Sequence, residues 1–140
     1  MLLMLEDCSE RIARFSAVLH AIQPKFKLRV WRNAWLMIRD LEQSLPKARL
    51  ISLNHDLEPE SESAEDPGTG WDLIRVLAEH PPCCPVIVHS SNRERSTWMM
   101  GELELGKWPH YRVPPLGEDW IETIWRHTVL RLLRRSRKQR

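Results

Sequence analysis

Five short strand-like segments, each followed by a segment of helical periodicity, limit most strongly how this chain of 140 residues can fold. Regular alternation of strand and helix favours a parallel sheet that is covered by helices on both faces. We therefore expect one three-layer α/β/α domain whose five parallel strands lie in the order 2-1-3-4-5. The strand-like segments are expected at residues 2–5, 27–31, 49–53, 85–89 and 110–113.

The segments between these strands have the spacing and the ends that are typical of helices. In the first of them, Ile12, Phe15 and Leu19 repeat at steps of three and four. Pro24 then ends the pattern. The stretch from 58 to 70 differs, because it is rich in acids, proline and glycine and has no periodicity. We expect its acidic part, residues 58–66, to be a solvated, mobile segment, with a role as a lid as the alternative.

Charge is distributed unevenly along the chain. Residues 126–140 contain seven of the 21 basic residues and no acid, which leaves 14 basic against 19 acidic residues in the rest. A basic end of this kind is typical of a solvated helix terminus, where it also suits the helix dipole. Binding of nucleic acid through 131–140 is the weaker alternative. We therefore divide the chain into a domain at 1–130 and a basic helix end or tail at 131–140.

Membrane and secretion signals are not expected from this composition. No apolar stretch reaches the length of a membrane helix, and the apolar residues 1–5 lack the basic leader of a signal peptide. Cys8, Cys83 and Cys84 are odd in number and lack metal-ligand spacing, which favours a reducing compartment. We expect a cytoplasmic protein and predict no particular oligomeric state.

Acidic side chains follow the first and third predicted strands. Glu6 and Asp7 come directly after the first strand, and Asp56 follows the third. In an open parallel sheet the carboxyl ends of the strands form the ligand crevice, so these acids should lie close together. Carboxylates of this kind suit magnesium or manganese, which we expect Glu6, Asp7 and Asp56 to bind. The alternative is that Asp7 only caps a helix and Asp56 only caps a turn.

Histidines and small polar residues complete the predicted site. His55 and His89 end neighbouring strands at what the sequence suggests are equivalent positions, and imidazoles can give and take protons near neutral pH. We expect them to be the catalytic pair, unless one or both are merely packed and hydrogen-bonded. A phosphate group is expected to bind to the polar residues beside them and to the start of the following helix. These phosphate-binding residues are Asn54, Ser90, Ser91 and Asn92.

The seven tryptophans are expected mainly in the core, because most of them fall on apolar helix faces. The segment Trp108–Tyr111 differs, since it follows a helix in a predicted loop near the crevice. Stacking of this segment on a base or ring of a ligand is therefore an alternative to packing in the core or at its rim.

This arrangement of polar groups resembles the receiver domain of response regulators. Glu6, Asp7 and Ser90 match the metal-binding acid pair and the phosphoryl-sensing residue of receivers. The phosphoacceptor position falls on Asn54, which cannot form an acyl phosphate. The lysine that receivers place before a proline is also replaced, because the chain reads Arg112-Val113-Pro114-Pro115.

Two motifs resemble more closely the family of cyclic-phosphate processing receiver domains. They are Ser52-Leu53-Asn54-His55-Asp56-Leu57 and Val88-His89-Ser90-Ser91-Asn92. The family pattern has aspartate where this chain has Asn54. The resemblance implies a metal-assisted phosphoesterase that acts on cyclic phosphates. The rival hypothesis is an inert pseudo-receiver that signals by binding a protein partner through the face of the fourth helix, fifth strand and fifth helix.

Overall fold

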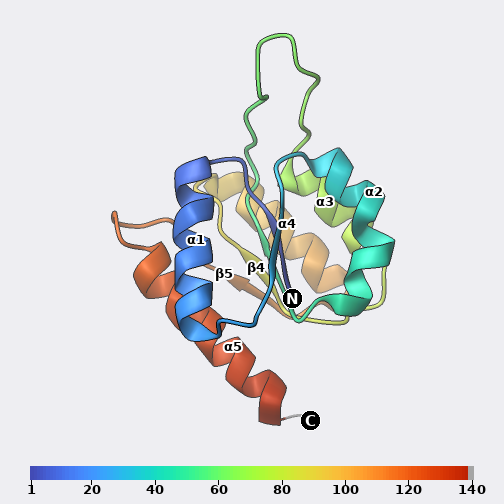
Figure 1. Ribbon diagram of the computed structural model, residues 1–140. Coiled ribbons are helices and arrows are strands. Elements are labelled where there is room, and N and C mark those ends of the chain that lie inside the picture. Colours follow the sequence, from blue (N-terminus) through green and yellow to red (C-terminus); the bar gives the residue numbers. More distant parts are fainter. Residues whose placement is uncertain (139–140) are drawn as a thin grey trace.

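The computed structural model, which describes residues 1–138, confirms the predicted α/β/α fold (Figure 1). Five parallel strands lie in the order β2-β1-β3-β4-β5. Residues 139–140 of the predicted tail lie outside the described residues. The strands are β1 Leu2–Leu5, β2 Leu28–Trp31, β3 Leu50–Leu53, β4 Val86–Val88 and β5 His110–Arg112. The helices are α1 Ser9–Ile22, α2 Ala34–Ser44, α3 Gly70–Leu77, α4 Arg93–Leu105 and α5 Arg126–Lys138, with a short 3-10 turn at Leu45–Lys47.

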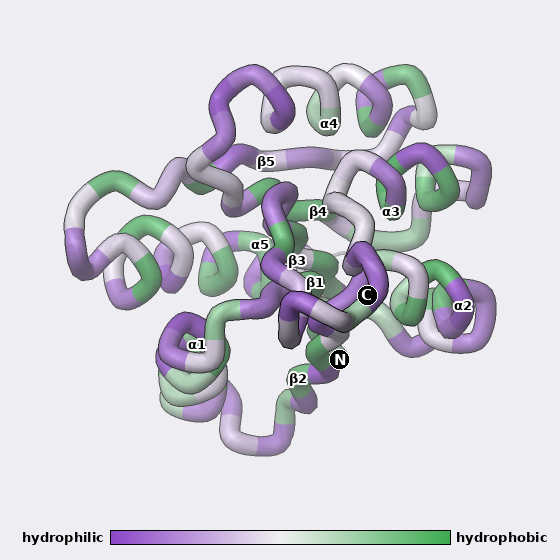
Figure 2. The backbone as a smooth tube through the Cα atoms, turned by 90° about the horizontal axis from the view of Figure 1, so that it is seen from above, coloured by the Kyte–Doolittle hydropathy of each residue, from purple (hydrophilic) through white to green (hydrophobic). Residues whose placement is uncertain are grey.

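Helices cover both faces of the sheet, which explains why the central strands are apolar throughout. Strands β1, β3 and β4 are buried at every position, whereas the edge strands β2 and β5 are partly open. Figure 2 shows α1 and α5 on one side of the sheet and α2, α3 and α4 on the other. Alternate strand residues feed two separate apolar clusters, one under each helical layer. Because the alternation continues past the strand ends, it determines toward which face of the sheet the next side chains point.

The last helical segment is not the single helix that the sequence predicts. It begins with a wider turn at Ile121–Trp125, in which the N–H of Trp125 donates to the carbonyl of Trp120, five residues back. The extra residue in this turn lets Trp120, Ile121 and Trp125 all face the core, where each is at most 4% exposed. Wide turns of this kind often lie at functional sites, and this one carries the Trp125 ring to the middle of the sheet.

The acidic loop at 58–66 projects beyond the carboxyl edge of the sheet, as Figure 1 shows in green between β3 and α3. Every residue in it is exposed, which confirms the predicted solvated loop. Among residues 1–138 there is no helix with the length and apolar character needed to cross a bilayer. Cys8, Cys83 and Cys84 are all free, and the cytoplasmic location stays a prediction.

Asp40 links β2 to α2 and provides a pH-dependent contribution to stability. Its carboxylate accepts hydrogen bonds from Arg39 Nε at 3.0 Å and from Trp31 Nε1 at 2.9 Å. These two donors lower the pKa of Asp40 to about 2. A lowered pKa means that the folded state binds the proton less well than the unfolded state, so the ionised carboxylate stabilises the fold.

We therefore expect Asp40→Asn to be less stable than the parent chain at pH 7. The difference should be complete above the ordinary pKa of 3.8 and should shrink as the pH falls toward about 2. Thermal unfolding of both proteins between pH 7 and pH 2 measures this. A stability gap of the same size across the whole range would contradict the assignment.

Candidate functional site

Three segments that are far apart in the sequence meet at the carboxyl edge of the sheet. The N–H of Asn54 donates to the carbonyl of Leu5, and the N–H of His89 donates to the carbonyl of Leu53. Asn54 Nδ2 lies 3.5 Å from Glu6 Oε2, which joins the ends of β1 and β3 through side chains. The structure thus brings the predicted polar clusters together at one edge of the sheet.

Glu6 is a fully enclosed carboxylate at this edge. Its Oε2 accepts hydrogen bonds from the N–H groups of Asp7 and Cys8 at 2.9 and 3.0 Å. Its Oε1 lies 3.2 Å from His89 Nε2. Burial by itself would raise the pKa of Glu6, but hydrogen bonding to His89, the charge of that ring when protonated, and the Cys8 N–H lower the pKa to about 2. Local donors therefore already satisfy this carboxylate.

His89 is also fully buried, and both of its ring nitrogens have partners. Its Nδ1 lies 2.7 Å from Ser52 Oγ, and its Nε2 faces Glu6. Trp125 Nε1 donates to Ser52 Oγ at 3.1 Å. Because an indole only donates, the Ser52 hydroxyl can donate in turn to Nδ1 of a neutral ring. This chain of hydrogen bonds holds Glu6 in one orientation, so its contacts favour a positioning role for His89, and direct catalysis by His89 stays a prediction.

The two histidines are not at equivalent positions, and the sequence-based expectation was wrong by one residue. Leu53 pairs with Val88, so His89 is one residue beyond this pair and His55 is two residues beyond it. Successive residues of a strand point to opposite faces of the sheet. His89 accordingly lies on the side of α1, with its ring centroid 5.0 Å from that of Phe15.

His55 and Asp56 form a second histidine–carboxylate pair. His55 Nδ1 lies 2.8 Å from Asp56 Oδ1, and the Asp56 side chain is 61% exposed. Asn92 Nδ2 lies 3.4 Å from Asp56 Oδ2, which connects the loop after β3 to the start of α4. A carboxylate on Nδ1 fixes the tautomer and orientation of an imidazole, which leaves Nε2 to exchange a proton. A ligand can reach the exposed carboxylate of Asp56, whereas the His55 side chain is only 6% exposed.

Asn54 and Gly70 set the shape of the loop after β3. Asn54 Oδ1 accepts from the N–H of His55 at 2.8 Å, and Nδ2 donates to the carbonyl of Asp56 at 3.0 Å. The N–H of Gly70 donates to the carbonyl of His55. A Cβ at position 70 would collide with the carbonyl oxygen of Asn54, so only glycine lets α3 begin this close to β3. Phosphate binding by Asn54 stays a prediction, since its amide already has partners inside the protein.

Asp7 and Asp56 are the two predicted cation ligands whose side chains are not fully buried. Asp7 Oδ2 accepts from the N–H of Glu58 at 2.6 Å, so Asp7 touches the loop two residues after Asp56. Burial, together with the neighbouring Glu6, raises the pKa of Asp7 against the opposing effect of the Glu58 N–H. Magnesium is commonly held by one or two carboxylates with waters and phosphate oxygens, which suits this pair.

Glu6 fits a cation less well than these two, because its side chain is fully buried and both of its oxygens already have partners. Within residues 1–138, no three His, Cys, Asp or Glu side chains are grouped closely enough to hold a metal ion by themselves. A cation at this edge would therefore need waters or ligand oxygens in addition to Asp7 and Asp56. The predicted set of Glu6, Asp7 and Asp56 stays a prediction.

Ser90, Ser91 and Asn92 form the turn that leads from β4 into α4. Ser90 is fully buried, and its Oγ accepts from the N–H of Asn92 at 3.0 Å. Asn92 caps α4, since its Oδ1 accepts from the N–H of Arg95 at 3.0 Å. Ser91 is exposed at the tip of the turn. The contact of Ser90 holds this turn, and phosphate binding by Ser90, Ser91 and Asn92 at the start of the helix stays a prediction.

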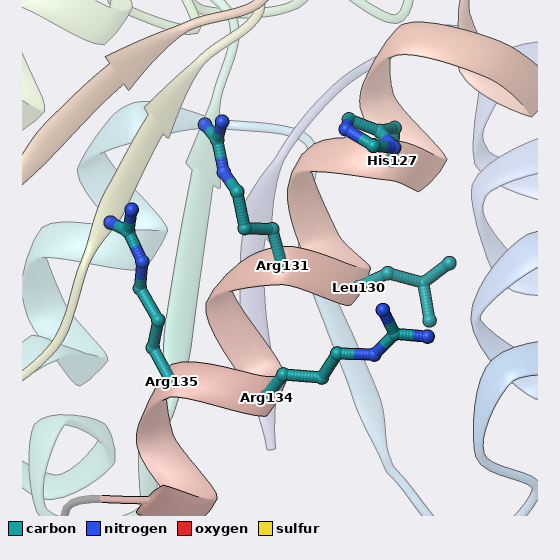
Figure 3. Close-up of a pocket in the computed structure, with 5 residues that line it drawn as sticks. All are labelled: His127, Leu130, Arg131, Arg134 and Arg135. Atoms are coloured by element: carbon teal, nitrogen blue, oxygen red, sulfur yellow. The ribbon is translucent and has the colours of Figure 1, made fainter.

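The basic C-terminal segment continues α5 as far as Lys138. Leu132 and Leu133 are buried, so packing on the domain extends past the predicted boundary at residue 130. Figure 3 shows Arg131 and Arg135 extending to one side of α5 and Arg134 to the other, around a surface cavity of about 410 Å³. A separate role of residues 131–140, including nucleic-acid binding, stays a prediction. The cavity is lined by His127, Leu130, Arg131, Arg134 and Arg135.

The tryptophans divide into buried and exposed groups. Trp108 is only 1% exposed and donates from Nε1 to the carbonyl of His80, so the hypothesis that it stacks on a ligand was wrong. Trp98 is 41% exposed on α4, beside the candidate site, and sequence reasoning missed it. The signal was available, because the core spacing of Met99 and Leu103 leaves Trp98 off the apolar stripe. The buried tryptophans are Trp31, Trp108, Trp120 and Trp125.

The fold and the site define the class of this protein as a receiver domain like those of response regulators. A response regulator receiver domain from Rhodospirillum rubrum has a TM-score of 0.68 and 16% identity, with 92% of this chain and 90% of that chain covered. The signal receiver domain of a protein described as a Luxo repressor, from Vibrio parahaemolyticus, has a TM-score of 0.65 and 16% identity, with 99% and 93% covered. The manganese-bound response regulator Rcp1 has a TM-score of 0.53 and 16% identity, with 88% and 87% covered.

At 16% identity, the similarity to these structures shows the fold alone. A match to a sequence family identifies the protein more closely. The family model described as the cyclic-phosphate processing receiver domain matches residues 1–105. The chain belongs to this family. The match spans β1 to the end of α4 and therefore includes the His55–Asp56 pair and the turn at Ser90–Asn92. No curated protein sequence matches the chain.

Proposed function

We propose that this domain binds a cyclic phosphate ester at the carboxyl edge of its sheet and hydrolyses it with the help of a divalent cation. The His55–Asp56 contact of 2.8 Å carries the proposal, because it orients an imidazole whose carboxylate partner also contacts Asn92 at the start of α4. Membership of the cyclic-phosphate processing receiver family supports the substrate class. The adjoining exposed Ser91 and the helix cap Asn92 support binding of a phosphate group.

Hydrolysis of a cyclic phosphate adds one water across a phosphorus–oxygen bond. His55 would accept a proton from the attacking water, and Asp56 would stabilise the imidazolium that forms. The water oxygen bonds to phosphorus as the bond between phosphorus and the ring oxygen breaks, and the leaving oxygen takes up a proton from solvent to become a hydroxyl group. His55 returns its own proton to solvent. Ser91 and Asn92 would hold the phosphate oxygens during this step. His89 would act indirectly, by holding Glu6 and through it the end of β1.

Asp7 and Asp56 would hold the cation, magnesium or manganese. When bound, the cation would neutralise charge that gathers on the phosphate oxygens. Glu6 would hold the backbone at Asp7 in position, because its Oε2 accepts hydrogen bonds from the N–H groups of Asp7 and Cys8. The ligands proposed here differ from the predicted cation ligands Glu6, Asp7 and Asp56 only at Glu6. Because Glu6 is buried and hydrogen-bonded, we assign it the role of holding the backbone of Asp7 in place.

The test is incubation of the full chain with 2′,3′-cyclic AMP and either magnesium or manganese. We expect formation of a nucleoside monophosphate, and its loss when EDTA removes the cation. Product analysis by chromatography measures both. Failure of the protein to open the cyclic phosphate with either metal would reject the enzymatic proposal.

A second candidate function, an inert pseudo-receiver that binds a protein partner, is favoured by one specific observation. Receivers carry their phosphoacceptor aspartate at the position of Asn54, and an amide cannot accept a phosphoryl group. Asn54 Nδ2 lies 3.5 Å from Glu6 Oε2, where an aspartate would instead be repelled by the charge of Glu6. Leu105 at the end of α4 is 79% exposed, which suits the predicted face of α4, β5 and α5. Treatment with acetyl phosphate and magnesium, followed by mass spectrometry, should give no phosphoryl adduct under either proposal. An adduct on Asp56 would indicate conventional phosphotransfer instead.

A further inference from the structure

The half-buried Trp71 and Arg95 and the exposed Trp98 form a partly exposed aromatic surface between the first turn of α3 and the first two turns of α4. The rings of Trp71 and Trp98 meet edge to face with their centroids 5.8 Å apart. The guanidinium of Arg95 lies 3.9 Å from the centroid of the Trp98 ring. Trp98 remains 41% exposed in this arrangement, so part of a large aromatic surface faces solvent. We call Trp71, Arg95 and Trp98 the aromatic ledge.

The aromatic ledge adjoins the proposed phosphate site through both of its helices. Gly70, the residue before Trp71, donates its N–H to the carbonyl of His55. Asn92 caps α4 at the site, and Trp98 follows it after six residues, a rise of about 9 Å along the helix axis. Gly70 links the two helices to the site, because a Cβ on it would lie 2.8 Å from Cε of Met99, the neighbour of Trp98, and would collide with the carbonyl oxygen of Asn54.

The chemistry of the aromatic ledge suits a flat, aromatic group that is attached to an anion. Nucleobases stack on tryptophan rings and on the planes of arginine guanidinium groups. The first turn of α4 contains Arg93, Glu94 and Arg95, which gives a net charge of plus one at the end of the helix that the phosphate would approach. A ligand with a phosphate at one end and a base at the other would therefore contact both surfaces at once.

We propose that the aromatic ledge binds the base of a nucleoside cyclic phosphate whose phosphate lies at the carboxyl edge of the sheet. This inference rests on the proposed function and narrows its substrate class from cyclic phosphate esters in general to those that carry an aromatic base. Trp98 and Arg95 supply the stacking surface, and Trp71 supports Trp98 from the edge of its ring.

The test compares two ligands that share the same cyclic phosphate and differ in the base. Calorimetric titration with magnesium uses 2′,3′-cyclic AMP and glycerol 1,2-cyclic phosphate, in a His55→Gln background so that neither ligand is consumed. We expect the nucleotide to bind about tenfold more tightly, as stacking of one base allows. Trp98→Ala should remove this preference and leave the affinity for the glycerol ester unchanged. Leu105→Ala, an exposed apolar residue of the same helix, is the matched control and should change neither affinity.

The outcomes separate this inference from the proposed function. Equal affinity of the two ligands, or a preference that survives Trp98→Ala, would overturn the role of the aromatic ledge and leave the phosphate site standing. A parallel loss of both affinities in Trp98→Ala would also overturn it, because the ledge should act on the base alone. Absence of binding by either ligand in the otherwise unchanged chain would overturn the proposed function, and this inference with it.

Discussion

Replacing Glu6 by alanine is expected to lower the free energy of unfolding by about 3–5 kcal/mol. The variant removes the acceptor for the buried His89 Nε2 and for the N–H groups of Asp7 and Cys8. None of these donors gains a new partner from alanine, and a buried polar group without a partner is costly. Because Glu6 has no exposed surface, solvent does not screen the loss. Denaturation with urea, followed by circular dichroism, measures the change.

A double-mutant cycle shows how much of the stability lost in Glu6→Ala comes from its contact with His89. If the Glu6–His89 contact is the main cause, Glu6→Ala combined with His89→Leu should cost clearly less than the sum of the two single changes. Glu6→Gln retains an acceptor oxygen and should lose about 1–3 kcal/mol. A loss below about 1 kcal/mol in Glu6→Ala would mean that the buried chain from Trp125 to Glu6 does not hold this edge of the sheet.

Replacing His55 by glutamine is expected to lower kcat for hydrolysis of 2′,3′-cyclic AMP by about 10²- to 10⁴-fold, the usual contribution of a general base. Glutamine occupies much of the imidazole volume, so the 2.8 Å contact with Asp56 is lost without a large cavity. Initial rates at saturating substrate measure the effect, and urea denaturation confirms that the fold persists.

The matched control for this change is His20→Ala, which removes an exposed histidine of α1 and should leave the rate unchanged. His89→Ala should lower stability and rate together, because His89 is enclosed and acts through Glu6. An active His55→Gln variant would remove His55 from the mechanism. A His89→Ala variant with full stability and no activity would return the catalytic role to His89.

The fold was predictable because the apolar runs, the helical periodicity and the order of the segments all indicate the same architecture. Apolar runs such as Leu2–Leu5 predict strands buried on both faces, and their alternation with helical segments predicts the parallel sheet. The wide turn at Ile121–Trp125 was not predictable, since periodicity alone does not distinguish a five-residue step from the ordinary helical repeat.

The candidate site was predictable in its location and less so in its roles. The strand ends identified the segments that meet, but the face that each residue reaches depends on a pairing register that the sequence leaves open by one residue. Because of this one-residue difference, His89 is fully buried on the α1 side of the sheet, whereas His55 contacts the exposed carboxylate of Asp56. The exposure of Trp98 could have been predicted from the spacing of Met99 and Leu103, but its contact with Trp71 depends on how α3 packs against α4.

The most direct measurement of the central claim, a phosphate and cation site at the carboxyl edge, is anomalous diffraction from crystals soaked with manganese and phosphate. We expect a manganese peak between the carboxylates of Asp7 and Asp56, with the phosphate against Ser91 and Asn92. Both ions bound elsewhere on the molecule, or a filled phosphate position remote from His55, would contradict this account.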